Sequence, residues 1–244
     1  MDATQHSTPL VRKLESILVL SEDEKDVLRN VSGTIKTVGP RQDLVREGDR
    51  PFECCLILEG FAYRYKQTED GKRQIFSSHI PGDIPDLQSL HLDVMDHSLS
   101  SLPACTAMFI PHEVIRDLTR RCPRIGDAFW RDTLIDGAVF REWMLGLGRR
   151  EAYGRMAHLL CELYVRLKAV GLTNGDAYAF PLTQAEFGDA LGLSTVHVNR
   201  TLQDLRGEGL ITLRSGSVAV LDWDRLREAG EFDPTYLHLR KAAA

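Results

Sequence analysis

The 244-residue sequence contains no apolar run of the roughly 18 to 20 residues that a membrane-spanning helix needs. Its N-terminus, MDATQHSTPLVRKLESILVL, also lacks the basic and then apolar opening that is typical of a secretory signal. Both absences predict a cytoplasmic protein that does not interact with membranes.

Cysteine is scarce, and none of it stands in a Cys-x-x-Cys pair. The five cysteines are Cys54, Cys55, Cys105, Cys122 and Cys161. An odd number without paired spacing argues against a disulfide framework and against a zinc ribbon, and favours a reducing compartment. We expect each cysteine to act as a small buried apolar residue, and a redox-sensing thiol would require a basic neighbour that lowers its pKa.

Positive charge is not in excess, since the formal net charge is -5. This charge argues against a protein that coats nucleic acid, and any DNA contact must come from a local basic surface. No Ser-His-Asp, Walker or paired-carboxylate arrangement is present, so we predict that the protein is not an enzyme.

One polar loop offers metal-binding side chains: His91, Asp93, Asp96 and His97 stand in HLDVMDHS. Histidine and aspartate together are able to hold a divalent ion. Loop spacing fixes no ligand geometry, however, so we favour a solvated loop, and we predict no metal and no cofactor.

The pattern of apolar residues changes twice along the chain. Short apolar runs broken by turn residues extend from about Val38 to Ile110, and Asp70-Gly71 marks a hairpin within them. Helical spacing follows from about His112 to Val170. The remainder alternates strand, helix, helix and hairpin, so the sequence predicts an α+β fold with a β domain, a long helix and a small α+β domain.

Two short helices near the C-terminus carry clear start signals. Thr183 and Glu186 form a capping box, and Ser194 is placed to begin a second helix after Gly192, which suits a tight turn. In the second helix Val198, Leu202 and Leu205 form an inward stripe. These features predict a helix-turn-helix.

The strands on either side of Ser215-Gly216 then predict a wing. Exposed Asn and Arg side chains in the second helix suit base edges and phosphates. The residues predicted to contact DNA are Thr183, Ser194, Thr195, Val196, His197, Asn199, Arg200, Gln203, Arg214 and Ser215. The alternative is a helical hairpin that binds only protein, which would not require the wing or Arg200.

The segment LTQAEFGDALGLSTVHVNRTLQDLRGEGLI resembles the family of the cyclic-AMP receptor protein and the Fnr-type regulators. LILEGFAYRYK, DGKRQI and the PGD at Gly82-Asp83 resemble it more loosely, in the same order along the chain. The resemblance implies a cyclic-nucleotide-binding-like β-roll (jelly roll), a dimerisation helix and a winged helix-turn-helix that enters the major groove. It also implies RNA polymerase as a partner. We place these parts at residues 1–122, 123–148 and 149–244.

The sequence departs from that family at the residues expected to bind a ligand or cofactor. Its cyclic-nucleotide binders carry Gly-Glu after the PGD turn and Arg-Ser or Arg-Thr further on, where this sequence has Pro85-Asp86 and about Met95-Asp96. We therefore predict a degenerate ligand pocket with Asp83, Asp86 and Asp96, in which like charge disfavours a cyclic phosphate. No cysteine precedes Cys54, which argues against an Fnr-type iron-sulfur centre. No residue marks the axial ligand that a haem would need, and the question of a haem is left open.

In the recognition helix, Thr195 and Val196 replace the family's first Arg and its Glu, and Arg200 alone remains. For this reason, the operator sequence of the family is not expected to apply to this protein.

The helix from about Pro123 to Leu147 has more apolar residues than one buried stripe needs. One face is available for the β-roll and another for a second copy, although Asp132 and Asp136 interrupt a strict heptad. The residues predicted for dimerisation are Phe129, Leu134, Ile135, Val139, Trp143 and Leu147.

The sequence as a whole predicts a homodimeric, sequence-specific DNA-binding transcription regulator that acts on palindromic promoter sites and is not gated by cyclic AMP. A redox- or metal-responsive regulator of the same fold is one alternative. A sensor whose helix-turn-helix binds protein is the other. The effector, the operator, the regulated genes and the choice between activation and repression stay open.

Overall fold

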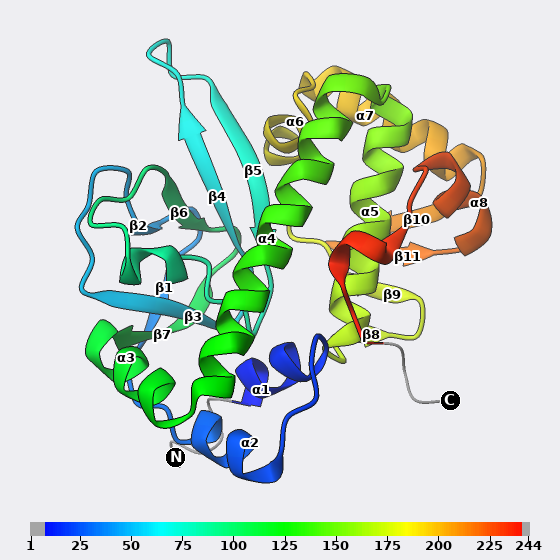
Figure 1. The fold of residues 1–244 in the computed structure, drawn as a ribbon. Coiled ribbons are helices and arrows are strands. Elements are labelled where there is room, and N and C mark those ends of the chain that lie inside the picture. Colours follow the sequence, from blue (N-terminus) through cyan, green and yellow to red (C-terminus); the bar gives the residue numbers. More distant parts are fainter. Residues whose placement is uncertain (1–7, 241–244) are drawn as a thin grey trace.

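The computed structural model describes residues 8–240 and begins with two short helices (Figure 1). They are α1 (Thr8–Glu15) and α2 (Glu22–Arg29). Ser21 and Glu24 form a capping box at the start of α2. Neither helix is among the predicted elements, although Ser21 and Glu24 carry the Ser-x-x-Glu signal of a helix start.

The β domain contains two antiparallel sheets with strand orders β1-β7-β3 and β2-β6-β4-β5. Its strands are β1 (Thr34–Val38), β2 (Asp43–Val45), β3 (Glu53–Glu59), β4 (Ala62–Gln67), β5 (Arg73–His79), β6 (Ser98–Ser101) and β7 (Cys105–Pro111), with the 3-10 helix η2 (Leu87–Leu90) between β5 and β6. The predicted hairpin at Asp70-Gly71 joins β4 to β5, and Gly71 adopts a left-handed φ of 81°.

Both faces of β3 are covered, because neighbouring residues on a strand point to opposite sides. Cys54 packs in a cluster with α1, α3 and α4, whereas Cys55 packs between the two sheets. Each has 0% exposure, and both therefore act as small apolar residues of the core.

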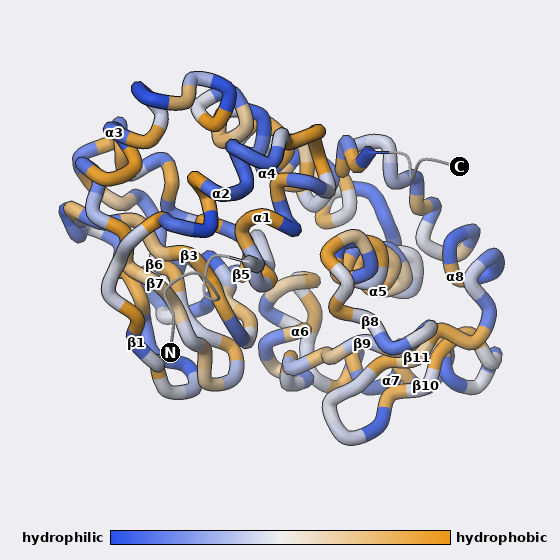
Figure 2. The backbone as a smooth tube through the Cα atoms, turned by 90° about the horizontal axis from the view of Figure 1, so that it is seen from below, coloured by the Kyte–Doolittle hydropathy of each residue, from blue (hydrophilic) through white to orange (hydrophobic). Residues whose placement is uncertain are grey.

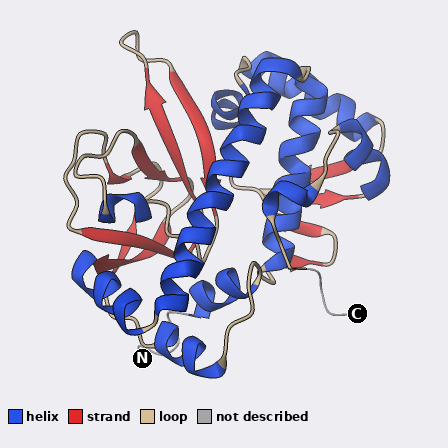
Figure 3. Ribbon diagram, in the orientation of Figure 1, coloured by secondary structure: helices blue, strands red, loops and turns tan. Residues whose placement is uncertain are grey.

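Three helices follow in the middle of the chain: α3 (His112–Arg121), α4 (Pro123–Arg149) and α5 (Ala152–Ala169). Pro123 suits the first position of α4, because that position needs no backbone N–H donor. α4 has 27 residues and runs between the β domain and the C-terminal domain (Figures 1 and 3). The predicted long helix is confirmed.

The C-terminal domain places three further helices and one sheet around α5. Its elements are β8 (Thr173–Asn174), β9 (Ala177–Ala179), α6 (Gln184–Leu191), α7 (Thr195–Gly207), β10 (Ile211–Arg214), β11 (Ser217–Val220), α8 (Trp223–Ala229) and the 3-10 helix η3 (Pro234–Leu237). The sheet order is β10-β11-β9-β8, and these strands lie along one side of α5 in Figure 2.

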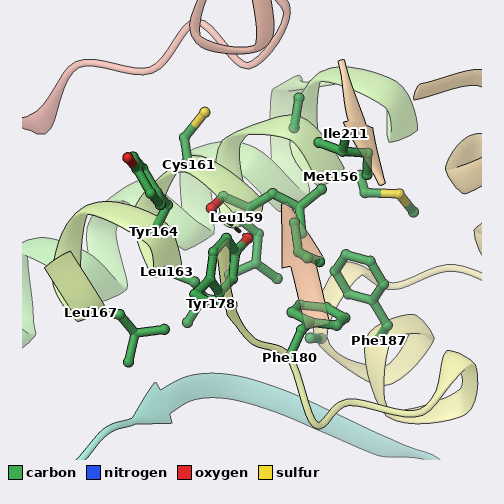
Figure 4. Packing of buried hydrophobic residues seen from close by; sticks show 14 of the residues in the cluster. Met156, Leu159, Cys161, Leu163, Tyr164, Leu167, Tyr178, Phe180, Phe187 and Ile211 are labelled. Carbon is green, nitrogen blue, oxygen red and sulfur yellow. Dashed lines mark hydrogen bonds between the residues drawn. The ribbon is translucent and has the colours of Figure 1, made fainter. Parts of the chain in front are cut away.

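Large side chains from α5, the sheet and α6 fill the core of this domain (Figure 4). The rings of Phe180 and Phe187 meet edge to face, with their centres 5.1 Å apart. Tyr178 is fully enclosed, and its hydroxyl donates to the carbonyl of Leu160 at 2.9 Å. This core holds α6 and α7 in fixed positions.

The α+β architecture with a β-roll, a long helix and a winged helix-turn-helix is thus as predicted. None of the helices within residues 8–240 is both long enough and apolar enough to cross a membrane.

Candidate DNA interface and effector pocket

The first helix of the helix-turn-helix, α6, begins as predicted. The Thr183 hydroxyl accepts from the backbone N–H of Glu186 at 3.2 Å, and the Glu186 carboxylate accepts from the backbone N–H of Thr183 at 2.8 Å. The helix ends at Gly192 with φ 63°. At Gly188 a Cβ would lie 2.5 Å from the Leu193 carbonyl oxygen, so the close turn also requires glycine there.

The second helix, α7, begins at Ser194, whose hydroxyl accepts from the backbone N–H of His197 at 3.3 Å. Val198, Leu202 and Leu205 are buried against the domain core, as predicted. The opposite face of α7 is consequently directed toward solvent.

All the residues predicted to contact DNA are exposed. Val196, Asn199, Arg200 and Gln203 recur at the spacing of one helix face. The wing turns at Ser215 and Gly216, which have φ of 50° and 73°, and this turn leaves Arg214 exposed. Arg206 is exposed one turn beyond Gln203. It is not among the predicted contacts, although the same helical spacing points to it.

Two ion pairs connect α6 to the β domain. Arg41 Nε lies 2.8 Å from Glu186 Oε1, and Arg73 lies 2.8 Å from Asp189 Oδ2. Gln74 adds a hydrogen bond to the Ala190 carbonyl at 3.3 Å. The β4–β5 hairpin and the turn before β2 therefore hold the helix-turn-helix against the β-roll.

A small cavity of about 60 Å³ lies where the β-roll, α1, α4 and α5 meet. At its wall, the Asp83 carboxylate forms ion pairs with Lys13 of α1 at 2.7 Å and with Arg166 of α5 at 3.0 Å. Lys13 also lies 3.3 Å from Asp132 of α4. One buried carboxylate thus connects the N-terminal helix to the DNA-binding domain.

These charges stabilise one another against burial. Burial alone would raise the pKa of Asp83, but Lys13, the hydrogen bond from His79 and Arg166 hold this pKa well below its ordinary value. Burial would lower the pKa of Lys13, yet Asp132 and Asp83 raise it. Lys13 and Asp83 are therefore both charged at neutral pH.

A second pair lines the same cavity, with Arg64 Nη1 2.5 Å from Asp136 Oδ2. The Arg64 guanidinium also donates to the Pro85 carbonyl. Burial, followed by the nearby charge of Arg64, lowers the pKa of His79 to about 4, so this imidazole is neutral at pH 7. The cavity wall is thus partly apolar, and its charged side chains are largely paired with one another.

Of the three residues predicted for the degenerate pocket, only Asp83 lines the cavity. Asp86 is buried on the other side of its loop and accepts from the backbone N–H of Cys55 at 2.7 Å. Burial raises the pKa of Asp86 to about 6.

The placement of Asp96 in the pocket is wrong. Its side chain is 78% exposed and lies 2.7 Å from His97 Nδ1. A carboxylate on a loop keeps its hydration in this position, whereas the neighbouring Met95 is buried in the β-roll. Counting residues along the loop did not identify the side chains that reach the cavity.

The apolar residues of α4 divide into two faces. Phe129, Ile135, Val139 and Trp143 are buried within this chain, so they support the helix and do not face a partner, which corrects their predicted role. Leu147 is half-buried. Asp132 and Asp136, which interrupt the heptad in sequence, line the cavity.

The other face of α4 carries exposed apolar side chains. Trp130 is 66% exposed, Leu134 54% and Met144 58%. These residues occupy heptad-spaced positions, although Gly137 and Arg141 stand at the two positions between Leu134 and Met144. Dimerisation through this face stays a prediction.

Four of the five cysteine side chains are buried as expected, whereas Cys122 is half-buried. Burial raises the pKa of Cys54, Cys55, Cys105 and Cys161, to about 11 for Cys105 and about 12 for Cys161. A raised pKa keeps a thiol protonated and slow to oxidise. Within residues 8–240, no three His, Cys, Asp or Glu residues lie close enough together to hold a metal ion.

Comparison with known proteins agrees with this architecture. Residues 35–122 match the cyclic nucleotide-binding domain, and residues 154–229 match the Crp-like helix-turn-helix domain. The transcriptional activator protein FnrL of Cereibacter sphaeroides is 32% identical over 198 residues, which cover 78% of this chain and 78% of FnrL. The chain belongs to the Crp-Fnr family.

Two further similar proteins share less sequence identity with this chain. The fumarate and nitrate reduction regulatory protein of Vibrio cholerae is 24% identical, over 86% of this chain and 83% of that protein. The structure of FixK2 from Bradyrhizobium japonicum matches with a TM-score of 0.73 at 22% identity, over 87% of this chain and all of that chain (100%). As a Crp-Fnr protein, the chain is a DNA-binding transcription regulator.

Proposed function

We propose that this Crp-Fnr protein binds palindromic promoter sites as a homodimer and does so without cyclic AMP. The observation that carries the proposal is the exposed face of α7, where Asn199 and Arg200 stand beside an exposed wing. Such side chains at the start of a recognition helix reach base edges in the major groove.

Independence from cyclic AMP is supported by the effector pocket. Its volume of about 60 Å³ is far below the roughly 300 Å³ at which small-molecule sites begin. Lys13 and Arg166 are already engaged by Asp83. An incoming phosphate would have to separate these pairs and would meet three carboxylates, from Asp83, Asp132 and Asp136, in the same wall.

Dimerisation is supported by the open apolar face of α4. Trp130, Leu134 and Met144 lie along one side of a helix that spans the molecule, where water contacts them in the single chain. Pairing two such faces around a two-fold axis would bury them and would place two copies of α7 on opposite half-sites.

The test is to map the genomic fragments that the purified protein retains, without added nucleotide, and to measure their affinity by mobility shift at several salt concentrations. We expect an enriched inverted repeat and an affinity that falls steeply with salt. The Arg200→Ala variant is the matched comparison, because Arg200 is exposed and its loss should not affect folding. Retention of fragments without any common sequence would contradict the proposal.

A further inference from the structure

Val196 is the most exposed of the large apolar side chains within residues 8–240, with 80% of its surface in contact with solvent. It is the second residue of α7, which is capped by Ser194 and begins at Thr195. Single exposed apolar residues are common on protein surfaces, so exposure by itself assigns no role. The position on the recognition helix is what distinguishes Val196.

Val196 begins the face that points away from the domain core. Asn199 and Arg200 follow it by three and four residues and are also exposed, while Val198 and Leu202 point inward. Residues at this spacing share one helix face. A helix that docks through Asn199 and Arg200 therefore brings Val196 to the same groove.

The chemistry of valine limits what it can recognise there. Its side chain neither donates nor accepts a hydrogen bond. Contact with a polar base edge would therefore displace the water bound there without replacing its hydrogen bonds. The major groove has one apolar group, the C5-methyl of thymine, and apolar side chains make their specific base contact with it. Cytosine offers an amino group in the same region and is disfavoured.

We propose that Val196 is a specificity-determining residue that reads a thymine methyl in each half-site. The inference rests on the proposed function and adds one base to it. An α-helix rises 1.5 Å per residue, so Val196 and Arg200 are separated by ~6 Å along α7. At about 3.4 Å per base pair this corresponds to a thymine about two steps from the base pair that Arg200 contacts.

The experiment begins with selection of binding sites from a random duplex pool by the wild-type protein. Each thymine of the selected half-site is then replaced by uracil, which removes the methyl group and preserves base pairing. We expect one position at which uracil weakens wild-type binding about fourfold, the effect of one buried methyl-sized group. In a further duplex, cytosine is installed at that position and is then replaced by 5-methylcytosine. This second replacement should recover part of the lost affinity, because it returns a methyl group to the groove.

The variant that tests the side chain is Val196→Ala. It should bind the thymine and uracil duplexes equally at that position, while its unfolding midpoint stays close to that of the wild type because 80% of the Val196 surface is exposed. Val19→Ala is the matched control: Val19 is 62% exposed but lies between α1 and α2, far along the chain from α7. This control should retain the wild-type preference for thymine.

The outcomes separate the two proposals. A wild-type protein that enriches no sequence would overturn the proposed function, and this inference with it. Two other outcomes would overturn this inference alone, provided that the wild type enriches a clear site. In the first, no uracil replacement weakens wild-type binding. In the second, uracil still weakens binding by Val196→Ala.

Discussion

The ammonium group of Lys13 lies 2.7 Å from a carboxylate oxygen of Asp83, in the wall of the pocket that faces α4 and α5. Lys13 comes from the first helix described, and Asp83 from the turn after β5. A cation from the chain itself thus neutralises the carboxylate at this site. Ligand-free DNA binding is the functional consequence we propose.

Substitution of Lys13 by Met should destabilise the fold, because it leaves Asp83 and Asp132 buried with less positive charge around them. Breaking a buried pair typically lowers the free energy of unfolding by about 3 to 5 kcal/mol, and urea denaturation at pH 7 measures the change. Lys66, which pairs with Glu47 and is 51% exposed, supplies the control Lys66→Met, for which we expect little effect. In a double-mutant cycle, Asp132→Asn should cost less in the Lys13→Met background than in the wild type.

Asp86 should make stability depend on pH. Its folded pKa of about 6 lies above the ordinary value of 3.8, so the protonated form favours folding. That contribution is fully present below pH 3.8 and is lost as the pH rises through about 6. Asp86→Asn keeps an oxygen for the Cys55 N–H and should gain stability over the wild type on going from pH 4 to pH 7, by at most ~3 kcal/mol. A difference between variant and wild type that is the same at both pH values would contradict this reading.

The protein should behave as a dimer in solution. Light scattering should give twice the chain mass of 27.5 kDa at micromolar concentration. Replacing Leu134 and Met144 by Glu places charge on the open face of α4 and should yield the single-chain mass with unchanged helicity. Val19→Glu, at another exposed apolar position, should remain a dimer, and a wild-type monomer would exclude this interface.

Cyclic AMP should not bind. Calorimetric titration of the wild type is expected to show no saturable heat, and the mobility shift on a selected duplex should be the same with and without the nucleotide. A stoichiometric heat, or a DNA affinity that changes with cyclic AMP, would show that the Lys13 and Arg166 pairs open to admit a phosphate.

Arg200 should be the guanine reader of the half-site. If its guanidinium contacts the O6 and N7 of guanine, Arg200→Ala costs about 1 to 3 kcal/mol and relaxes preference at one base pair per half-site, with half-sites about 34 Å apart. A phosphate contact would weaken all sequences equally and would reduce the salt slope by about one. Site selection and salt titration of both proteins distinguish these roles, and no change in either would remove Arg200 from the interface.

Local sequence signals were sufficient to predict much of the DNA-binding domain. The Thr183 capping box, the glycine turn at Gly192 and the Ser194 cap depend on residues only a few positions apart, and all three are confirmed. The wing followed from Ser215-Gly216 for the same reason. These features form wherever their own neighbours permit, so a single sequence predicts them.

The pocket could not be predicted in this way. Lys13, Arg64 and Arg166 meet Asp83 and Asp136 only because the folded chain brings distant segments together. In the sequence, Asp132 and Asp136 interrupt an apolar helix. Their place in the cavity wall can be recognised only when it is known which face of α4 points inward. Asp96 was misplaced because loop residues near one another in sequence diverge in space.

The last residues described contact the first helix. Arg240 donates from its backbone to the Ser16 carbonyl at 2.8 Å and from its side chain to the Glu15 carbonyl at 3.1 Å. A fragment that ended at the β-roll would thus lose α4, Arg166 and the Arg240 contacts, leaving Asp83 with only Lys13 and His79 as partners. Truncation at the C-terminus would therefore remove contacts to α1, and we expect it to lower the stability of the β-roll end of the molecule as well.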